Sequence, residues 1–211
     1  MTTSLARTSG PDPVLRFDHI AFAATQLEDG VAWLEEQLGV PLAAGGQHLA
    51  MGTHNRLLSL GPDLYLEVIA VDPEAAPPGR RRWFDLDRFD GPPRLHSWIV
   101  AAADGTPRPA YAGPPVALSR GDLRWSFTVL ESGALPFDGV GPPIITWEVG
   151  GHPTEKLTDV GVRLTGLTVS HPRAAELRVA LAGLESPLVE ITEGPAALAA
   201  TLSTPKGEVT L

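Results

Sequence analysis

The side chains best suited to chemistry lie in the first third of the chain. His19 stands in an apolar stretch, residues 17–23, and Glu67 is a single carboxylate in a second one, residues 64–70. If the two side chains meet, they can form a buried hydrogen-bonded pair that satisfies both groups. Alternatively, desolvation raises the pKa of Glu67, which then serves as a general base that His19 orients.

The segment between these stretches, residues 45–56, combines glycines with His48, His54 and Asn55. As a plain structural element it is a polar β-hairpin loop in which glycines supply positive φ angles. Its functional interpretation is the wall of a site, where the backbone approaches a ligand at Gly52. His54 is expected to be exposed in either case.

Later in the chain, a cation and three indoles are further candidates. Arg120 is either an exposed turn residue beside Asp122 or an anchor for a substrate carboxylate or phosphate. Trp98, Trp125 and Trp147 belong either to the core or to the apolar wall of a ligand cavity. The sequence leaves both choices open.

The elements that must position these residues follow the order strand, helix, strand, strand, strand. A helix is expected over residues 27–38, and strands over residues 17–24, 57–60 and 64–70. The leucines of the helix recur on one face. Thr25 and Glu28 have the spacing of a capping box, and Gly39 stands where a helix-ending glycine is expected.

The same order recurs about three times along the chain. Modules are expected over approximately residues 16–72, 95–150 and 163–211, after a loose tail at residues 1–15. A proline-rich linker replaces the helix in the second module. In the third, a helix with an apolar stripe from Ala174 to Leu184 begins at Pro172. The sequence therefore predicts an α+β fold of repeated βαβββ modules, with a curved mixed sheet around a pocket.

This order of motifs resembles the vicinal oxygen chelate superfamily, and specifically its glyoxalase-like domains (the glyoxalase, bleomycin resistance and extradiol dioxygenase type). The motifs are Asp18-His19-Ile20, Leu27-Glu28-Asp29-Gly30, Leu38-Gly39, His48 through Met51-Gly52-Thr53 to Asn55, Tyr65-Leu66-Glu67, Ser119-Arg120 with Trp125, and Leu135-Pro136-Phe137 leading to Trp147. The resemblance covers about residues 16–211. It favours His48 and Asn55 as parts of the site wall.

The resemblance implies a metal site in the first module. Metal-bearing members place one ligand on the first strand of a module and another on its last strand, which here are His19 and Glu67. Imidazole and carboxylate suit a divalent ion such as Mn, Fe, Ni or Zn, and such a site leaves open positions for two vicinal substrate oxygens. A site without any cofactor is equally consistent with these residues.

The second module departs from the family's ligand pattern. The position that matches His19 is Ser97, and His96 is expected to point away from the cup because neighbours on a strand face opposite ways. Glu148 is expected to face away as well. A third metal ligand would therefore have to come from His48, from Glu148, or from a strand whose register differs by one residue from this alignment.

Composition excludes several classes of function. The chain has 16 basic and 25 acidic residues, a formal net charge of −9, and no cysteine. Nucleic acid and anionic membrane are poor partners for such a chain, and disulfide, thiolate and cysteine-ligated metal chemistry are unavailable. The N-terminus lacks the pattern of a signal peptide, so we expect a cytoplasmic protein.

Two functions are expected from these observations. The first is a glyoxalase-like enzyme, such as a lyase, isomerase or dioxygenase, that acts on a small organic molecule with vicinal oxygens through a metal or a His/Glu acid–base pair. The second is a metal-free protein that binds or sequesters a drug-like or aromatic ligand. An odd number of modules would leave one without a partner, so a homodimer is also expected.

Overall fold

The structure, a computed structural model, describes residues 15–211. The expected tail lies outside the described residues except for Leu15, which is buried at the start of the first strand. The strands are β1 Leu15–Ala23, β2 Ala43–His48, β3 Thr53–Ser59, β4 Tyr65–Val71, β5 Arg94–Ala102, β6 Pro115–Arg120, β7 Leu123–Thr128, β8 Ile144–Val149, β9 Arg163–Ser170, β10 Val189–Thr192, β11 Ala197–Thr204 and β12 Gly207–Thr210. The helices are α1 Leu27–Leu38 and α2 Ala174–Ala180, with 3₁₀ turns η1 Trp83–Asp85, η2 Ala110–Ala112, η3 Phe137–Gly139 and η4 Pro153–Lys156.

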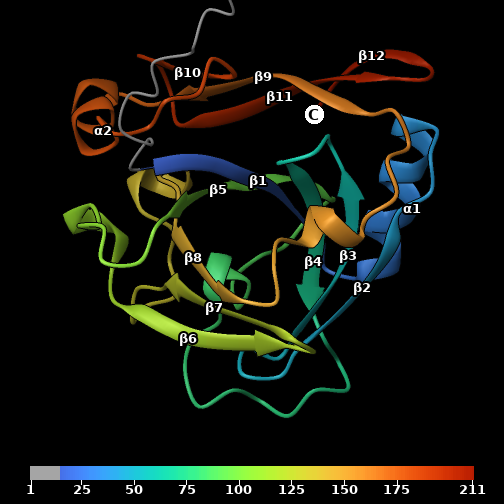
Figure 1. Cartoon of the computed structure of the whole chain (residues 1–211), viewed down its shortest axis with the longest axis horizontal. Helices are drawn as coiled ribbons and strands as arrows, with labels where there is room; N and C mark the ends of the chain where they lie inside the picture. The colour runs from blue at the N-terminus through green and yellow to red at the C-terminus, as the bar shows by residue number, and fades with distance from the viewer. Residues whose placement is uncertain (1–14) are drawn as a thin grey trace, which may run out of the picture.

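Strands β1 to β8 form one mixed sheet in the order β2-β3-β4-β1-β5-β8-β7-β6. β1 pairs in parallel with β4 and antiparallel with β5, so it joins the first two modules. The sheet curves into a nearly closed ring in which β2 and β6, its two edges, approach each other (Figure 1). Arg120 at the end of β6 reaches across this gap to Asn55 on β3. The predicted α+β fold with a curved mixed sheet is confirmed.

The third module forms a separate sheet in the order β10-β9-β11-β12. This second sheet lies along the side of the ring formed by β1 and β5 (Figure 1). Leu167 and Leu202 on its inner face share one apolar core with Phe17 and Trp98. The third module therefore buries its apolar face against the other two. This corrects the expectation that it would lack a partner.

Helix α1 spans the residues that its sequence pattern predicts. Leu34 on its inner face is fully buried, which contributes roughly 1.5–3 kcal/mol to stability. Gly39 ends the helix in the left-handed conformation, with φ 72°. The predicted capping box is wrong, because the N-cap residue is Gln26 rather than Thr25 and no side chain caps the helix.

In the second module the sequence correctly predicts that the helix is missing. The link between β5 and β6 contains only the single turn η2, and β11 of the third module lies against β5 instead. In the third module, α2 is shorter than expected: it ends at Ala180, and its N-cap is Arg173, so Pro172 precedes the helix. Over residues 15–211, no helix is both long and apolar enough to cross a membrane.

Candidate functional site

The curved sheet encloses a small cavity. Its lining combines one buried acid–base group with aromatic walls and a cation. The lining residues are His19, His48, Asn55, Leu57, Tyr65, Glu67, Trp83, Phe84, Arg120, Trp125, Phe127, Ile145 and Trp147. The ring thus brings together seven of the eight predicted site residues from strands of two modules.

Three acidic and basic groups form a chain beside this cavity. Asp18 and His19 are neighbours on β1, and a bulge at Asp18 interrupts the pairing of β1 with β5. The bulge lets both side chains meet on one side of the strand, with Asp18 Oδ1 2.5 Å from His19 Nδ1. On the opposite side of the imidazole, His19 Nε2 lies 3.5 Å from Oε1 of Glu67 on β4. All three side chains are buried.

The partners of these groups decide their charge. Burial by itself lowers the pKa of His19, but its hydrogen bonds to Asp18 and Glu67 outweigh burial and raise the pKa above its ordinary value. Burial likewise favours a raised pKa for Glu67, but its hydrogen bonds with His19 and Asn55 and the nearby imidazoles lower the pKa overall. The pKa of Asp18 is lowered well below its usual range, since the hydrogen bonds from His152 and His19 outweigh its burial. An imidazolium therefore lies between two carboxylates, and the expected raised pKa of Glu67 is wrong.

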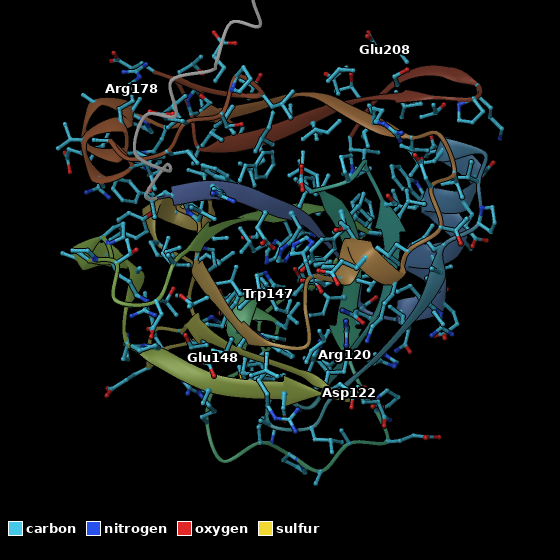
Figure 2. All side chains as sticks on the ribbon, in the orientation of Figure 1. Arg120, Asp122, Trp147, Glu148, Arg178 and Glu208 are labelled. Carbon is cyan, nitrogen blue, oxygen red and sulfur yellow. The ribbon has the colours of Figure 1, made fainter. Side chains whose placement is uncertain are left out.

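Asn55 connects Glu67 with the cation of the second module. Its amide nitrogen donates to Glu67 Oε2 at 2.9 Å, and its oxygen accepts from Arg120 Nη1 at 2.8 Å and from the Gly46 backbone N–H at 3.0 Å. Asn55 thereby fixes one side of the carboxylate and one edge of the guanidinium. Arg120 is half-buried in the lining, not an exposed turn residue. Figure 2 shows it at the end of β6, beside Asp122.

His48 forms a second, neutral polar group in the wall. Its Nδ1 lies 3.1 Å from Thr53 Oγ1, which also accepts a hydrogen bond from Trp83 Nε1 at 3.2 Å. Burial lowers the pKa of His48 to about 4, so this imidazole is uncharged at neutral pH. His54, which was expected to be exposed, is half-buried.

The three predicted tryptophans separate into two groups. Trp125 and Trp147 line the cavity with their rings 5.6 Å apart, and Trp147 Nε1 donates to Asp18 Oδ2 at 2.9 Å. In Figure 2, Trp147 lies inside the ring of strands. Trp98 lies on the opposite face of the sheet, in the core shared with the third module, and its Nε1 donates to the Val140 backbone oxygen. The structure does not bring Trp98 to the cavity.

Six lining residues were not predicted as site residues: Leu57, Tyr65, Trp83, Phe84, Phe127 and Ile145. Tyr65 stacks on His19 with ring centroids 4.3 Å apart, and its position two residues before Glu67 on one strand was a usable signal. Trp83 and Phe84 form a wall of the cavity from a proline-bracketed loop. The signal there was an aromatic pair inside an otherwise polar stretch.

His152 contacts the site from outside. Its Nε2 lies 3.3 Å from Asp18 Oδ2, and its ring packs edge-on against Tyr65 and Trp147. It begins η4, in the segment that connects the second and third modules. No local pattern announces this contact, because it depends on where the chain returns.

The side chains offer an incomplete set of metal ligands. Among residues 15–211, no cluster of three or more histidine, aspartate and glutamate side chains is arranged to hold a metal ion. His19 and Glu67 are close enough to bind one metal ion together. His48, however, directs its Nδ1 to Thr53, and the positive charge of Arg120 in the same wall repels a cation. The donors present do not fit the divalent metal that the resemblance implies.

The second module supplies no further ligand. Ser97 is buried, and its hydroxyl lies 3.5 Å from the Trp98 backbone oxygen. His96 is outside the lining and has its Nε2 2.7 Å from the backbone oxygen of Phe84. Glu148 is exposed, as expected. The second module therefore differs from the family's metal-ligand pattern in the structure as it does in the sequence.

A nearly closed sheet built from two related modules around a buried His–Glu pair defines a protein of the vicinal oxygen chelate type. The sequence model of the glyoxalase-like domain family matches residues 17–185, and the chain belongs to this family. No curated protein matches the chain significantly.

Comparison with solved structures finds similar chains at low sequence identity. A hypothetical protein from Staphylococcus aureus is 14% identical, with a TM-score of 0.55 over 93% of this chain and 84% of that one. Methylmalonyl-CoA epimerase from Mycobacterium tuberculosis is 19% identical, with a TM-score of 0.44 over 69% of this chain and 95% of that one. The similarity to the Staphylococcus aureus protein supports the fold and carries no information about activity.

Proposed function

We propose that this protein is a glyoxalase-like enzyme that moves a proton on a small organic molecule with vicinal oxygens, without a metal. The observation that carries the proposal is the buried chain Asp18–His19–Glu67, which ends in the cavity. A carboxylate and an imidazolium 3.5 Å apart can act as base and acid on neighbouring atoms of one ligand. Arg120 in the same lining suits a ligand with a carboxylate or another anionic oxygen.

In this mechanism the Glu67 carboxylate takes a proton from a carbon next to a carbonyl group. The electron pair of that C–H bond moves to the carbonyl oxygen, and an enolate forms. His19, as an imidazolium, donates a hydrogen bond or its proton to that oxygen. When His19 has given its proton to that oxygen, it takes the proton of the other vicinal hydroxyl while Glu67 delivers its proton to the former carbonyl carbon, which completes an isomerisation; return of the proton to the original carbon regenerates the substrate.

The charges of the pair fit this division of roles. The lowered pKa of Glu67 makes the carboxylate a weaker base, but it ensures that the group is ionised. The raised pKa of His19 favours the protonated form that acts as the acid. Asp18 accepts from Nδ1 of His19, which leaves Nε2 directed at Glu67.

Hydrogen–deuterium exchange tests this proposal. Incubation of 2-oxo acids and 2-hydroxyketones in D₂O is expected to give deuterium uptake next to the carbonyl, measured by NMR. Because a positioned base contributes about 100-fold or more, Glu67→Gln should slow uptake by at least about 100-fold. Glu148→Gln, at an exposed carboxylate, is the matched control and should exchange like the unmodified protein.

Metal dependence is measured on the same samples. We expect exchange to survive dialysis against a chelator, with no stoichiometric metal in protein purified without an affinity-tag metal. Stoichiometric metal that is lost in both His19→Ala and Glu67→Ala would instead support the metal site implied by the resemblance.

A second candidate function is binding without chemistry. It is favoured by the aromatic lining, in which Trp83, Trp125 and Trp147 surround the cavity together with two phenylalanines. Tight binding of aromatic ligands, with no exchange in any ligand that binds, would support it over the enzyme. The homodimer and the cytoplasmic location stay predictions, to be tested by size exclusion at micromolar concentration and by fractionation.

A further inference from the structure

His48 is a polar group in the cavity lining that the proposed mechanism does not use. It ends β2 directly opposite Thr53, the first residue of β3, and its side chain is buried. The imidazole packs edge-on against Trp83 and Trp125, with ring centroids 5.0 and 6.1 Å apart. These two indoles and Thr53 hold the ring in one orientation in the wall of the cavity.

The hydrogen bonds of Thr53 determine which nitrogen of His48 carries the proton. An indole N–H can only donate, so Thr53 Oγ1 accepts the hydrogen bond from Trp83 Nε1 at 3.2 Å. The hydroxyl has one proton of its own, and within residues 15–211 the other group bonded to Thr53 Oγ1 is His48 Nδ1, at 3.1 Å. Thr53 is fully buried, where an unpaired hydroxyl proton is costly. Thr53 therefore donates to Nδ1, and Nδ1 carries no proton.

The single proton of the His48 ring is then on Nε2. Burial lowers the pKa of His48 to about 4, so the ring is a neutral imidazole with one N–H group. Within the described part of the chain, Nε2 has no hydrogen-bond partner, and it is not fully enclosed. Because His48 lines the cavity, this N–H is a free donor that faces the space where a ligand would bind.

A donor that keeps its proton complements the His19–Glu67 pair. In the proposed mechanism His19 gives and takes protons at the vicinal oxygens, so it does not remain a donor throughout the reaction. Asn55 is already bonded to both Glu67 and Arg120. A neutral imidazole stabilises an enolate oxygen well, because it donates a hydrogen bond to the developing charge without losing its proton.

We infer that His48 is a further catalytic residue, which donates its Nε2–H to a vicinal oxygen of the substrate and stabilises the enolate while His19 transfers protons. The inference rests on the proposed function for the position of the reacting carbon beside Glu67. Trp83 and Thr53 are then positioning residues, because their hydrogen bonds keep His48 in the tautomer that donates into the cavity.

Nitrogen NMR of the free protein tests the tautomer. In protein labelled with ¹⁵N-histidine, correlations from the carbon-bound ring protons show which ring nitrogen carries the proton at neutral pH. We expect a protonated Nε2 and an unprotonated Nδ1 for His48, whose signals are assigned by their absence in His48→Asn. A ring protonated on Nδ1, or on both nitrogens, would overturn the inference.

Contact with a ligand is measured on the same signals. The probes are hydroxyacetone and pyruvate, two small molecules with vicinal oxygens. Each should shift Nε2 of His48 more than the ring nitrogens of His54, which is half-buried and outside the cavity lining. No shift with either probe, or equal shifts at both histidines, would overturn the donor role.

Two substitutions distinguish a donor from a structural residue. The amide of His48→Asn matches the position of Nδ1 and keeps a partner for Thr53, whereas that of His48→Gln reaches the position of Nε2 and can donate there. Because loss of one donor to an oxyanion costs about 100-fold or more, His48→Asn should slow deuterium uptake by about that factor. His48→Gln should slow it only several-fold. A purely structural role predicts the opposite order, with the asparagine variant less impaired.

Controls separate this inference from the proposed function. His54→Asn is the matched control and should take up deuterium like the unmodified protein. Uptake in His48→Asn equal to that of the unmodified protein, or faster than in His48→Gln, would overturn the inference alone. Failure of the proposed function is seen independently, as uptake that survives in Glu67→Gln, whereas the tautomer and the ligand-induced shifts of His48 require no reaction.

Discussion

Asp18 and His19 are neighbours in the chain, yet the Asp18 carboxylate accepts the Nδ1 proton of His19 at 2.5 Å. Side chains of consecutive strand residues normally face opposite ways, and the bulge in β1 removes this constraint. The same carboxylate accepts hydrogen bonds from Trp147 on β8 and interacts with His152 beyond it. One buried aspartate thus connects the first module, the second module and the segment that leads to the third.

Asp18→Asn should destabilise the protein and lower the pKa of His19. The substitution removes one of the two carboxylates beside the buried imidazolium, and breaking a buried ion pair costs about 3 kcal/mol or more. Urea unfolding and NMR titration of the His19 ring measure the two effects. Asp159→Asn, in an exposed pair with Arg163, is the matched control and should leave the urea midpoint almost unchanged. An unchanged pKa of His19 in Asp18→Asn would contradict the assignment.

The pairing of His19 with Asp18 and Glu67 predicts a loss of stability at high pH. The pKa of His19 is raised in the folded protein, so its contribution is complete below the ordinary value of 6.5 and is lost as the pH rises through the higher folded value. The pKa values of Asp18 and Glu67 are lowered, so their contributions are lost only as the pH falls below their ordinary values. His19→Asn should therefore show a weaker decline in urea midpoint above pH 6.5 than the unmodified protein.

The buried, uncharged His48 predicts a second loss of stability, at mildly acidic pH. Its pKa falls from 6.5 to about 4 on folding, so below pH 6.5 the unfolded chain binds a proton that the folded protein does not. The loss between pH 6.5 and 4 should approach about 3 kcal/mol. His48→Asn, which keeps a partner for Thr53, should flatten the pH profile of the urea midpoint in this range. A profile as steep as that of the unmodified protein would count against the neutral imidazole.

Arg120→Met should weaken the binding of anionic ligands such as 2-oxooctanoate by roughly 10- to 100-fold, because a charge-assisted hydrogen bond is lost. Isothermal titration calorimetry measures the change. Arg124→Met is the matched control, since Arg124 on β7 is exposed and its guanidinium donates to the backbone oxygens of Gly121 and Leu123. Equal losses in both variants would point to overall charge in place of a specific anchor.

His152→Ala should loosen the segment that carries η4. The substitution removes the contact with Asp18 and the packing on Tyr65 and Trp147, so we expect about 1–2 kcal/mol of lost stability. Trypsin should then cut after the exposed Lys156 several-fold faster, as measured by mass spectrometry of the fragments. Asp159→Ala in the same segment should leave that rate unchanged. Equal rates in all three proteins would show that His152 does not hold the segment.

The predictions from sequence hold best where the signal is local. The apolar face of α1 and its end at Gly39 depend on residues within a few turns, and both are confirmed. The predictions fail where a partner comes from elsewhere in the chain. The pKa of Glu67 is one case, because burial alone would raise it but His19 and Asn55 come from other strands.

Trp98 shows how sequence context can mislead. It shares its aromatic character with Trp125 and Trp147, yet it sits on the opposite face of the sheet. Trp98 follows Ser97, which stands at the position that matches His19, and consecutive residues of a strand face opposite ways. The face of Trp98 was therefore readable from strand alternation, which its residue type alone does not give.

The sequence by itself determined the family, the order of the modules and the candidates His19 and Glu67, because repeated apolar periodicity and motif spacing are properties of the chain. The tertiary structure decided which candidates meet. It placed Asp18 behind His19 and Asn55 between Glu67 and Arg120. The physical reason is that charge state and shape in a buried site are set by atoms within a few ångströms, and these atoms come from strands far apart in the sequence.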